Sequence, residues 1–138
     1  MGVGVAGQMV AGMTSCALVR ERKMSESYER EKMGAAVGAL ACSADPIQKR
    51  LENAWMAMHT LRVHGFIDSE AAAEFEAIDE LLTADKSDEK TGYVPTTCSR
   101  LSDDDASAIA RRIVDLDSRL NYARIYALED ELRDLKRG

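Results

Sequence analysis

The hydrophobic positions in the last third of the chain follow one helical pattern from Ser102 to Lys136. Its apolar residues alternate four and three positions apart, which is the spacing of a coiled-coil seam: Ile109, Ile113, Leu116, Leu120, Ala123 and Ala127. Ser102 and the aspartates that follow it mark the start, because a serine hydroxyl caps free backbone N–H groups and carboxylates favour the positive end of the helix dipole. A helix of this length is expected to pack against another long helix or a second copy of the chain.

The apolar pattern of this helix changes beyond Tyr122, where its large apolar residues become Ile125, Leu128, Leu132 and Leu135. The offset resembles a stutter, which rotates an apolar stripe part of the way round a helix. We therefore expect each half of the helix to face a different neighbour. A homodimer contact is predicted through Ile113, Leu116, Leu120, Ile125, Leu128 and Leu132.

Two shorter helical patterns precede the middle of the chain. Ser25 or Ser27 is expected to cap the first, which runs to about residue 43. Asp45 is expected to cap the second, with Pro46 at the first helical position, where its missing N–H costs nothing. The second pattern continues to about residue 63, and Gly65 is predicted to end it.

A third pattern starts at Asp68 or Ser69, and a region without a period follows it. The apolar stripe of this helix is predicted to be Ala71, Phe75, Ile78 and Leu82. Residues 84–101 are rich in turn-forming residues and are predicted to form a loop. Its large apolar side chains, Tyr93 and Val94, are expected either to anchor this loop to the core or to face a partner.

These patterns predict an all-α fold, an antiparallel helical bundle of about four helices with a long C-terminal helix. At 138 residues the chain is long enough for one domain with a real core, and β-branched runs of strand length are absent. We expect a helical domain over residues 25–138 and a weakly ordered or dispensable extension over residues 1–24. The stretch 2–19 carries no charge but is too polar for a convincing membrane span, so no membrane association is expected.

Charge and cysteine content narrow the function classes. The net charge is −6, and residues 45–101 contribute −5 of it. This balance argues against phosphate-backbone binding by the whole chain and leaves open a basic protein partner. The cysteines, Cys16, Cys42 and Cys98, are odd in number and widely spaced, which favours reduced thiols in the cytoplasm over disulfides or a zinc site.

The acidic third helix is the strongest candidate for a functional surface. Nine carboxylates lie between Asp68 and Glu89, against a single lysine. Such a face is often only solvated, yet it also steers a basic partner. The predicted partner-binding residues are Glu70, Glu74, Glu76, Asp79, Glu80, Asp85, Asp88, Glu89 and Tyr93. The expected function is that of a small non-catalytic interaction or regulatory protein, one version being an inhibitor that mimics nucleic-acid charge.

Two alternatives of other classes remain open. The first is a magnesium-dependent nucleotide hydrolase that uses two carboxylate pairs on helix faces: Glu76, Asp79, Glu131 and Asp134. The second is a DNA-associated helical dimer that uses Arg111, Arg112 and Arg119. No metal or cofactor is predicted, because the two histidines are five residues apart and no metal-ligand or phosphate-loop motif occurs.

Overall fold

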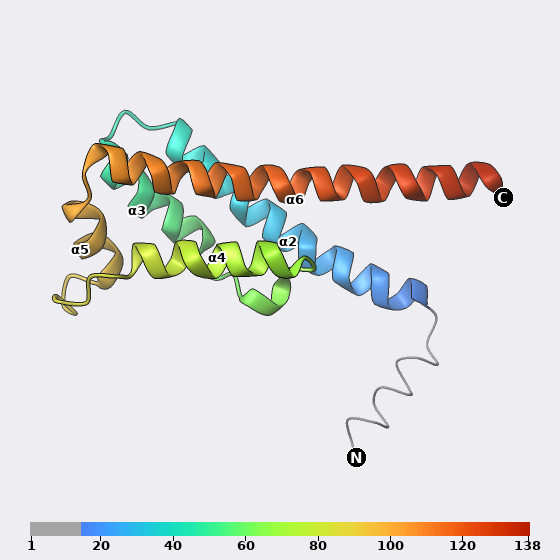
Figure 1. Cartoon of the computed structure of the whole chain (residues 1–138), viewed down its shortest axis with the longest axis horizontal. Coiled ribbons are helices and arrows are strands. Elements are labelled where there is room, and N and C mark those ends of the chain that lie inside the picture. The colour runs from blue at the N-terminus through green and yellow to red at the C-terminus, as the bar shows by residue number, and fades with distance from the viewer. Residues whose placement is uncertain (1–14) are drawn as a thin grey trace, which may run out of the picture.

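Helices make up the ordered framework of the computed structural model, which describes residues 15–138 and side chains from Glu26 onward. Its elements in chain order are α2 (Ser15–Ala41), α3 (Ile47–Met58), the short 3₁₀ turn η1 (Val63–Gly65), α4 (Ser69–Leu82), α5 (Tyr93–Arg100) and α6 (Asp103–Arg137). No strand occurs among these residues. The described part is therefore all-α, as predicted, but it contains five α-helices rather than about four (Figure 1).

The helix α2 begins earlier than predicted. It runs unbroken through Ser25 and Ser27, so neither residue acts as its N-terminal cap. No glycine or proline interrupts the chain between its start and Gly34, which lets the helix extend upstream. Residues 1–14 of the predicted N-terminal extension lie outside the described part. The buried residues Met33, Ala36 and Leu40 form the core-facing stripe of α2.

The helix α3 is shorter at both ends than predicted. Pro46 occupies the cap position without a side-chain hydrogen bond, and Asp45 instead accepts a hydrogen bond from Ser43 Oγ at 2.8 Å. The helix ends at Met58, well before Gly65. The Leu61 N–H donates to the Met58 carbonyl at 3.1 Å, and the Leu61 side chain is buried in the core. The Arg62 guanidinium donates to the carbonyls of His59 and Leu61, which satisfies acceptors left free at this end.

The predicted loop over residues 84–101 is partly wrong, because α5 occupies its second half. Gly92 precedes this helix with φ of 105°, a conformation that favours glycine. Val94, Thr97 and Cys98 are buried in the turn of helix that packs on α3. Threonine, serine and cysteine are weak helix formers, so packing rather than propensity explains this helix.

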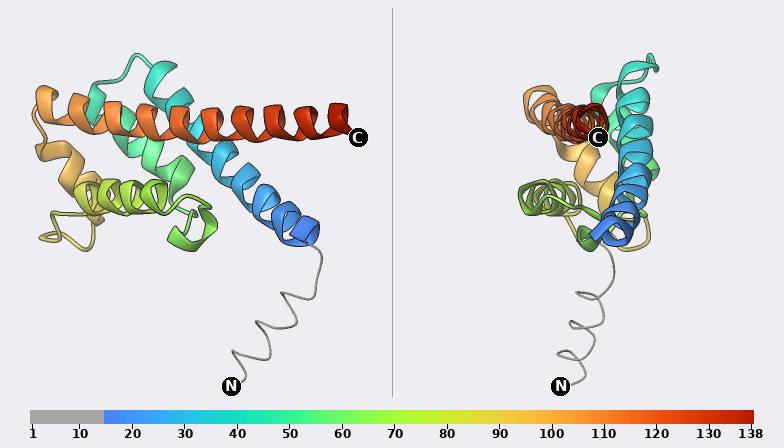
Figure 2. Two further views of the ribbon diagram at one scale, coloured as in Figure 1. Left: turned by 45° about the vertical axis from the view of Figure 1, so that its right-hand side comes forward. Right: turned by 90° about the vertical axis from the view of Figure 1, so that its right-hand side faces the viewer.

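The predicted caps of α4 and α6 and the stripe of α4 are confirmed, whereas the predicted α6 stripe is buried only as far as Leu120, because Ala123 is exposed and Ala127 only half-buried. Asp68 accepts a hydrogen bond from the backbone N–H of Glu70 at 2.9 Å, and Ser102 accepts one from that of Asp105 at 3.1 Å. The stripe of α4 is buried as expected: Ala71, Phe75, Ile78 and Leu82. It faces the first half of α6, whose buried residues are Ala106, Ile109, Ile113, Leu116 and Leu120. Figures 1 and 2 show the second half of α6 extending past α3, α4 and α5.

Candidate interaction surfaces

Arginines of α6 cover one side of the acidic helix α4. Arg119 Nε lies 2.6 Å from Asp68 Oδ2, and its Nη2 lies 2.7 Å from Glu70 Oε2. Arg112 Nε donates to Glu74 Oε1 at 2.6 Å. The hydrogen bond from Arg119 holds the pKa of the Asp68 carboxyl below its ordinary value. Two of the predicted partner-binding carboxylates, Glu70 and Glu74, are therefore paired inside the chain.

The remaining carboxylates of α4 differ in their surroundings. Asp79 accepts a hydrogen bond from Trp55 Nε1 at 3.2 Å, and the Trp55 ring stacks on His59 with centroids 5.2 Å apart. Glu76 and Glu80 are exposed and lie one turn apart on the same helix. Neither side chain has a hydrogen bond or ion pair to a residue that the structure describes. They form the unpaired part of the acidic cluster, called the outer face of α4 below.

The turn after α4 uses its carboxylates to hold its own backbone. Asp85 accepts hydrogen bonds from the backbone N–H and the hydroxyl of Ser87, at 3.0 and 2.6 Å, and forms an ion pair with Arg100. Asp88 accepts equivalent bonds from Thr91 at 3.1 and 2.6 Å. The hydroxyl hydrogen bonds lower the pKa of both carboxyls. These two predicted partner-binding residues therefore shape the turn.

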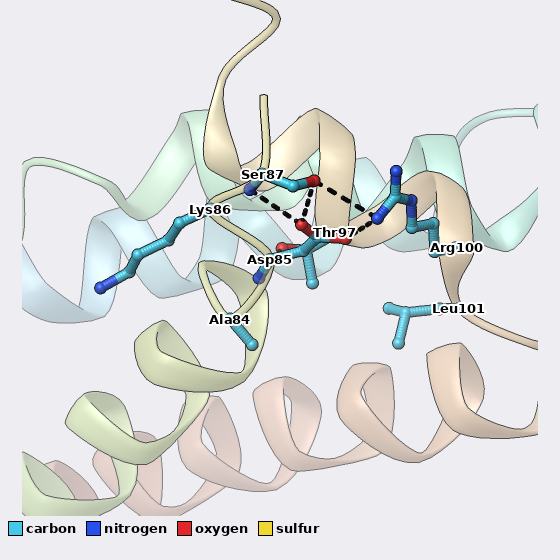
Figure 3. A pocket seen from close by; sticks show the side chains of 7 residues that line it. All are labelled: Ala84, Asp85, Lys86, Ser87, Thr97, Arg100 and Leu101. Atoms are coloured by element: carbon cyan, nitrogen blue, oxygen red, sulfur yellow. Dashed lines mark hydrogen bonds and ion pairs between the residues drawn. The ribbon is translucent and has the colours of Figure 1, made fainter. Parts of the chain in front are cut away.

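An open hollow lies beside this turn, between the ends of α4 and α5. Its lining residues are Ala84, Asp85, Lys86, Ser87, Thr97, Arg100 and Leu101 (Figure 3). In Figure 3, Asp85, Ser87 and Arg100 are joined by hydrogen bonds and an ion pair, and the Lys86 side chain points away from them. The Tyr93 hydroxyl donates to Glu89 Oε1 at 3.3 Å. Because the opposite charges of Asp85 and Arg100 in the lining already neutralise each other, we assign no ligand to this hollow.

The predicted dimer residues of α6 fall into two groups. Ile113, Leu116 and Leu120 are buried in the core of their own chain. Ile125, Leu128 and Leu132 are exposed. At 3.6 residues per turn, Leu128 and Leu132 lie about 80° and 120° round the helix axis from Leu120. The dimer prediction therefore narrows to the second half of α6, because the core occupies the other three side chains.

The structure separates the residues of the nucleotide-hydrolase alternative. Glu76 and Asp79 lie on α4, whereas Glu131 and Asp134 lie near the end of α6. The ion pair between Arg119 and Asp68 places the start of α4 beside position 119 of α6. Glu131 lies twelve residues further along α6, a distance of about 18 Å along the helix axis. Among the side chains that the structure describes, from Glu26 onward, no group of three or more histidine, cysteine, aspartate or glutamate residues is placed to hold a metal ion.

The basic residues of the DNA-binding alternative are also not grouped as a free positive face. Arg112 and Arg119 are engaged by carboxylates of α4, and only Arg111 of the three is exposed without such a pair in the described chain. Phosphate contact needs cations that remain available. The ion pairs therefore favour a role for Arg112 and Arg119 in holding α4 against α6.

Two buried glutamates of α2 were not predicted. Glu26 and Glu29 are only 5% and 4% exposed. Glu26 Oε2 accepts a hydrogen bond from the backbone N–H of Ile67 at 3.1 Å. Glu29 packs against Gly65 so closely that a Cβ there would lie 2.5 Å from its Oε2. Burial raises the pKa of the Glu29 carboxyl, and the Glu26 charge adds to the rise. A sequence signal existed: both residues continue the three-four spacing of the α2 core stripe backwards from Met33.

Comparison with known proteins adds no identification. The chain matches no protein family, no curated protein and no solved structure. Among its described helices, none combines the length and apolar character required to cross a bilayer. The functional argument therefore rests on the surfaces described above.

Proposed function

We propose that this chain is a non-catalytic, cytoplasmic interaction protein that binds a basic protein partner through the outer face of α4. The observation that carries the proposal is the pair of exposed, unpaired carboxylates at Glu76 and Glu80. Ala73 and Ala77, each three residues before one of these glutamates on the same helix, have small side chains. The free thiols at Cys42 and Cys98 agree with a reducing compartment.

The ion pairs of α4 show which of its carboxylates are left for a partner. Arg112 and Arg119 bind Glu74 and Glu70 on the α6 side of the helix, so those carboxylates serve the fold. The net charge of −6 gives the chain a long-range attraction for cations, and the outer face supplies the contact. In the most specific form of the proposal, the partner is a nucleic-acid-binding protein, because the positive site of such a protein complements the negative outer face of α4.

The test is capture of a partner from source-cell lysate, treated with nuclease, by the chain and by charge-reversed variants. The Glu76→Lys, Glu80→Lys double variant should lose the partner, because it replaces two attractive charges by two repulsive ones. The matched control reverses Glu31 and Asp134, which are exposed on α2 and α6 and change the net charge equally. It should retain the partner. Circular dichroism checks that both variants remain helical.

Unchanged capture by the double variant would refute the role of the outer face. Equal loss in both variants would show that net charge alone drives capture, which also contradicts the proposal. If added duplex DNA displaces the captured partner, the chain competes with nucleic acid for the partner's binding site. If it does not, the inhibitor version fails while the interaction through α4 stands.

A further inference from the structure

The end of α6 carries a row of apolar side chains that is open to solvent. Its members are Ile125, Leu128, Leu132 and Leu135, which are 46%, 44%, 54% and 78% exposed. This row, called the distal stripe below, lies on the part of α6 that projects past α3, α4 and α5 (Figure 2). Four large aliphatic residues in one row on a projecting helix are typical of a surface that packs against another helix.

The distal stripe has the spacing of a two-stranded coiled coil. Its steps of three, four and three residues place Ile125 and Leu132 at a positions and Leu128 and Leu135 at d positions of a heptad. In its first heptad, Ile125 at a with Leu128 at d is the combination that favours two parallel strands, and the second heptad has leucine at both positions. A segment this short would not form a stable helix by itself. Here the buried first half of α6 already holds the helix, so pairing requires little further ordering.

The charges beside the distal stripe complement those of an identical chain. Arg124 precedes an a residue, at g, and Glu129 follows a d residue, at e. In a parallel, in-register pair each g residue faces the e residue of the next heptad on the other helix, so Arg124 meets Glu129 of the second copy, twice by symmetry. Neither side chain has a hydrogen bond or ion pair to a described residue; Glu129 is exposed and Arg124 is half-buried.

We propose that residues 124–137 of two copies of this chain pair as a parallel, in-register, two-stranded coiled coil. The apolar row supplies the contact, and the Arg124–Glu129 pairs select the partner and its direction. The contact is isologous, because the same surface is used on both copies. It lies on a different helix from Glu76 and Glu80, so its failure would leave the proposed binding through α4 untouched, and the reverse also holds.

The first test is sedimentation of the full chain over a range of concentrations. We expect a monomer–dimer equilibrium that reaches twice the 15.1 kDa monomer mass. Leu132→Glu should raise the dimer dissociation constant roughly tenfold or more, because it places two carboxylates in the apolar contact. Tyr126→Glu is the matched control, since Tyr126 is 61% exposed on the same segment but lies outside the a and d positions. Its dissociation constant should change by less than about twofold.

A chain that stays monomeric at every concentration would overturn the proposal, as would equal effects of the two substitutions. Removal of residues 1–14 tests whether the N-terminal segment of the same chain occupies the stripe instead. If only the shortened chain dimerises, the N-terminal segment of the same chain covers the distal stripe and the proposal is wrong. If both forms dimerise equally, the stripe is free for a second copy, as proposed.

Charge exchange and cross-linking test the direction of pairing. Arg124→Glu and Glu129→Arg should each weaken the dimer by placing like charges opposite each other, and the double variant should restore it. With Cys16 and Cys42 replaced by serine, Leu135→Cys should give a disulfide-linked dimer under an added oxidant, whereas Tyr126→Cys should not. A dimer without restoration, or without the cross-link at position 135, would contradict the parallel register, since antiparallel pairing sets Leu135 opposite Ile125.

Discussion

Two leucines of α6 provide a direct test of how the structure divides this helix. Leu120 is 1% exposed in the core, and Leu132 is 54% exposed in the distal stripe. Leucine and alanine are both strong helix formers, so replacing either leucine by alanine leaves helix propensity nearly unchanged. Leu120→Ala removes buried methyl groups and leaves a cavity, which should lower the free energy of unfolding by about 2–5 kcal/mol. Leu132→Ala should change it by less than about 0.5 kcal/mol in the monomer.

The assay is urea unfolding followed by circular dichroism, at a protein concentration where sedimentation shows only monomer. For a chain of this size, a loss of about 3 kcal/mol corresponds to a melting temperature lowered by about 10 °C. The dependence of the free energy on urea should stay the same in both variants, since neither changes the surface exposed on unfolding. If Leu132→Ala destabilises the monomer as much as Leu120→Ala, the distal stripe is buried within the chain and the division of α6 is refuted.

Three further predictions follow from individual contacts. Because burial raises the pKa of Glu29, the free energy of unfolding should fall as pH rises through that raised value. Glu29→Gln should therefore be more stable than the natural chain at pH 7 and equal to it near pH 4, and parallel melting curves at both pH values check this sign. Burial also raises the pKa of the Cys98 thiol to about 11, so iodoacetamide at pH 8 should label the exposed Cys42 and leave Cys98 unlabelled until urea is added; early labelling of Cys98 would contradict its burial. Ser102→Ala should cost about 1 kcal/mol in urea unfolding, because it removes the acceptor for the N–H of Asp105, whereas Ser102→Asp should retain that stability.

The acidic cluster shows why a charge count does not define a binding surface. The sequence places nine carboxylates between Asp68 and Glu89, and the count is correct. Arginines from distant parts of the chain, Arg100, Arg112 and Arg119, then neutralise several of them. Each such pair joins residues at least 15 positions apart, so no local pattern predicts it. The free charges that remain are therefore fewer than the sequence indicates.

What the sequence by itself determined is local in origin. The all-α class follows from its helix formers, and the caps at Asp68 and Ser102 depend on hydrogen bonds within one turn. The buried stripe of α4 follows from helical periodicity alone. The offset beyond Tyr122 predicted a change in the direction of the apolar residues along α6, and the structure leaves those after the offset exposed.

Only the tertiary structure decided which of those stripes the chain itself buries. The helices α2 and α4 both contact α6, yet burial on α6 stops at Leu120, so Leu120 belongs to the core while Leu132 faces solvent. The same long-range packing forms α5 from weak helix formers and buries Glu26 and Glu29 under the turn at residues 63–67. Helical periodicity identifies which face of a helix is apolar. Whether that face is buried depends on where the other segments pack, which only the tertiary structure determines.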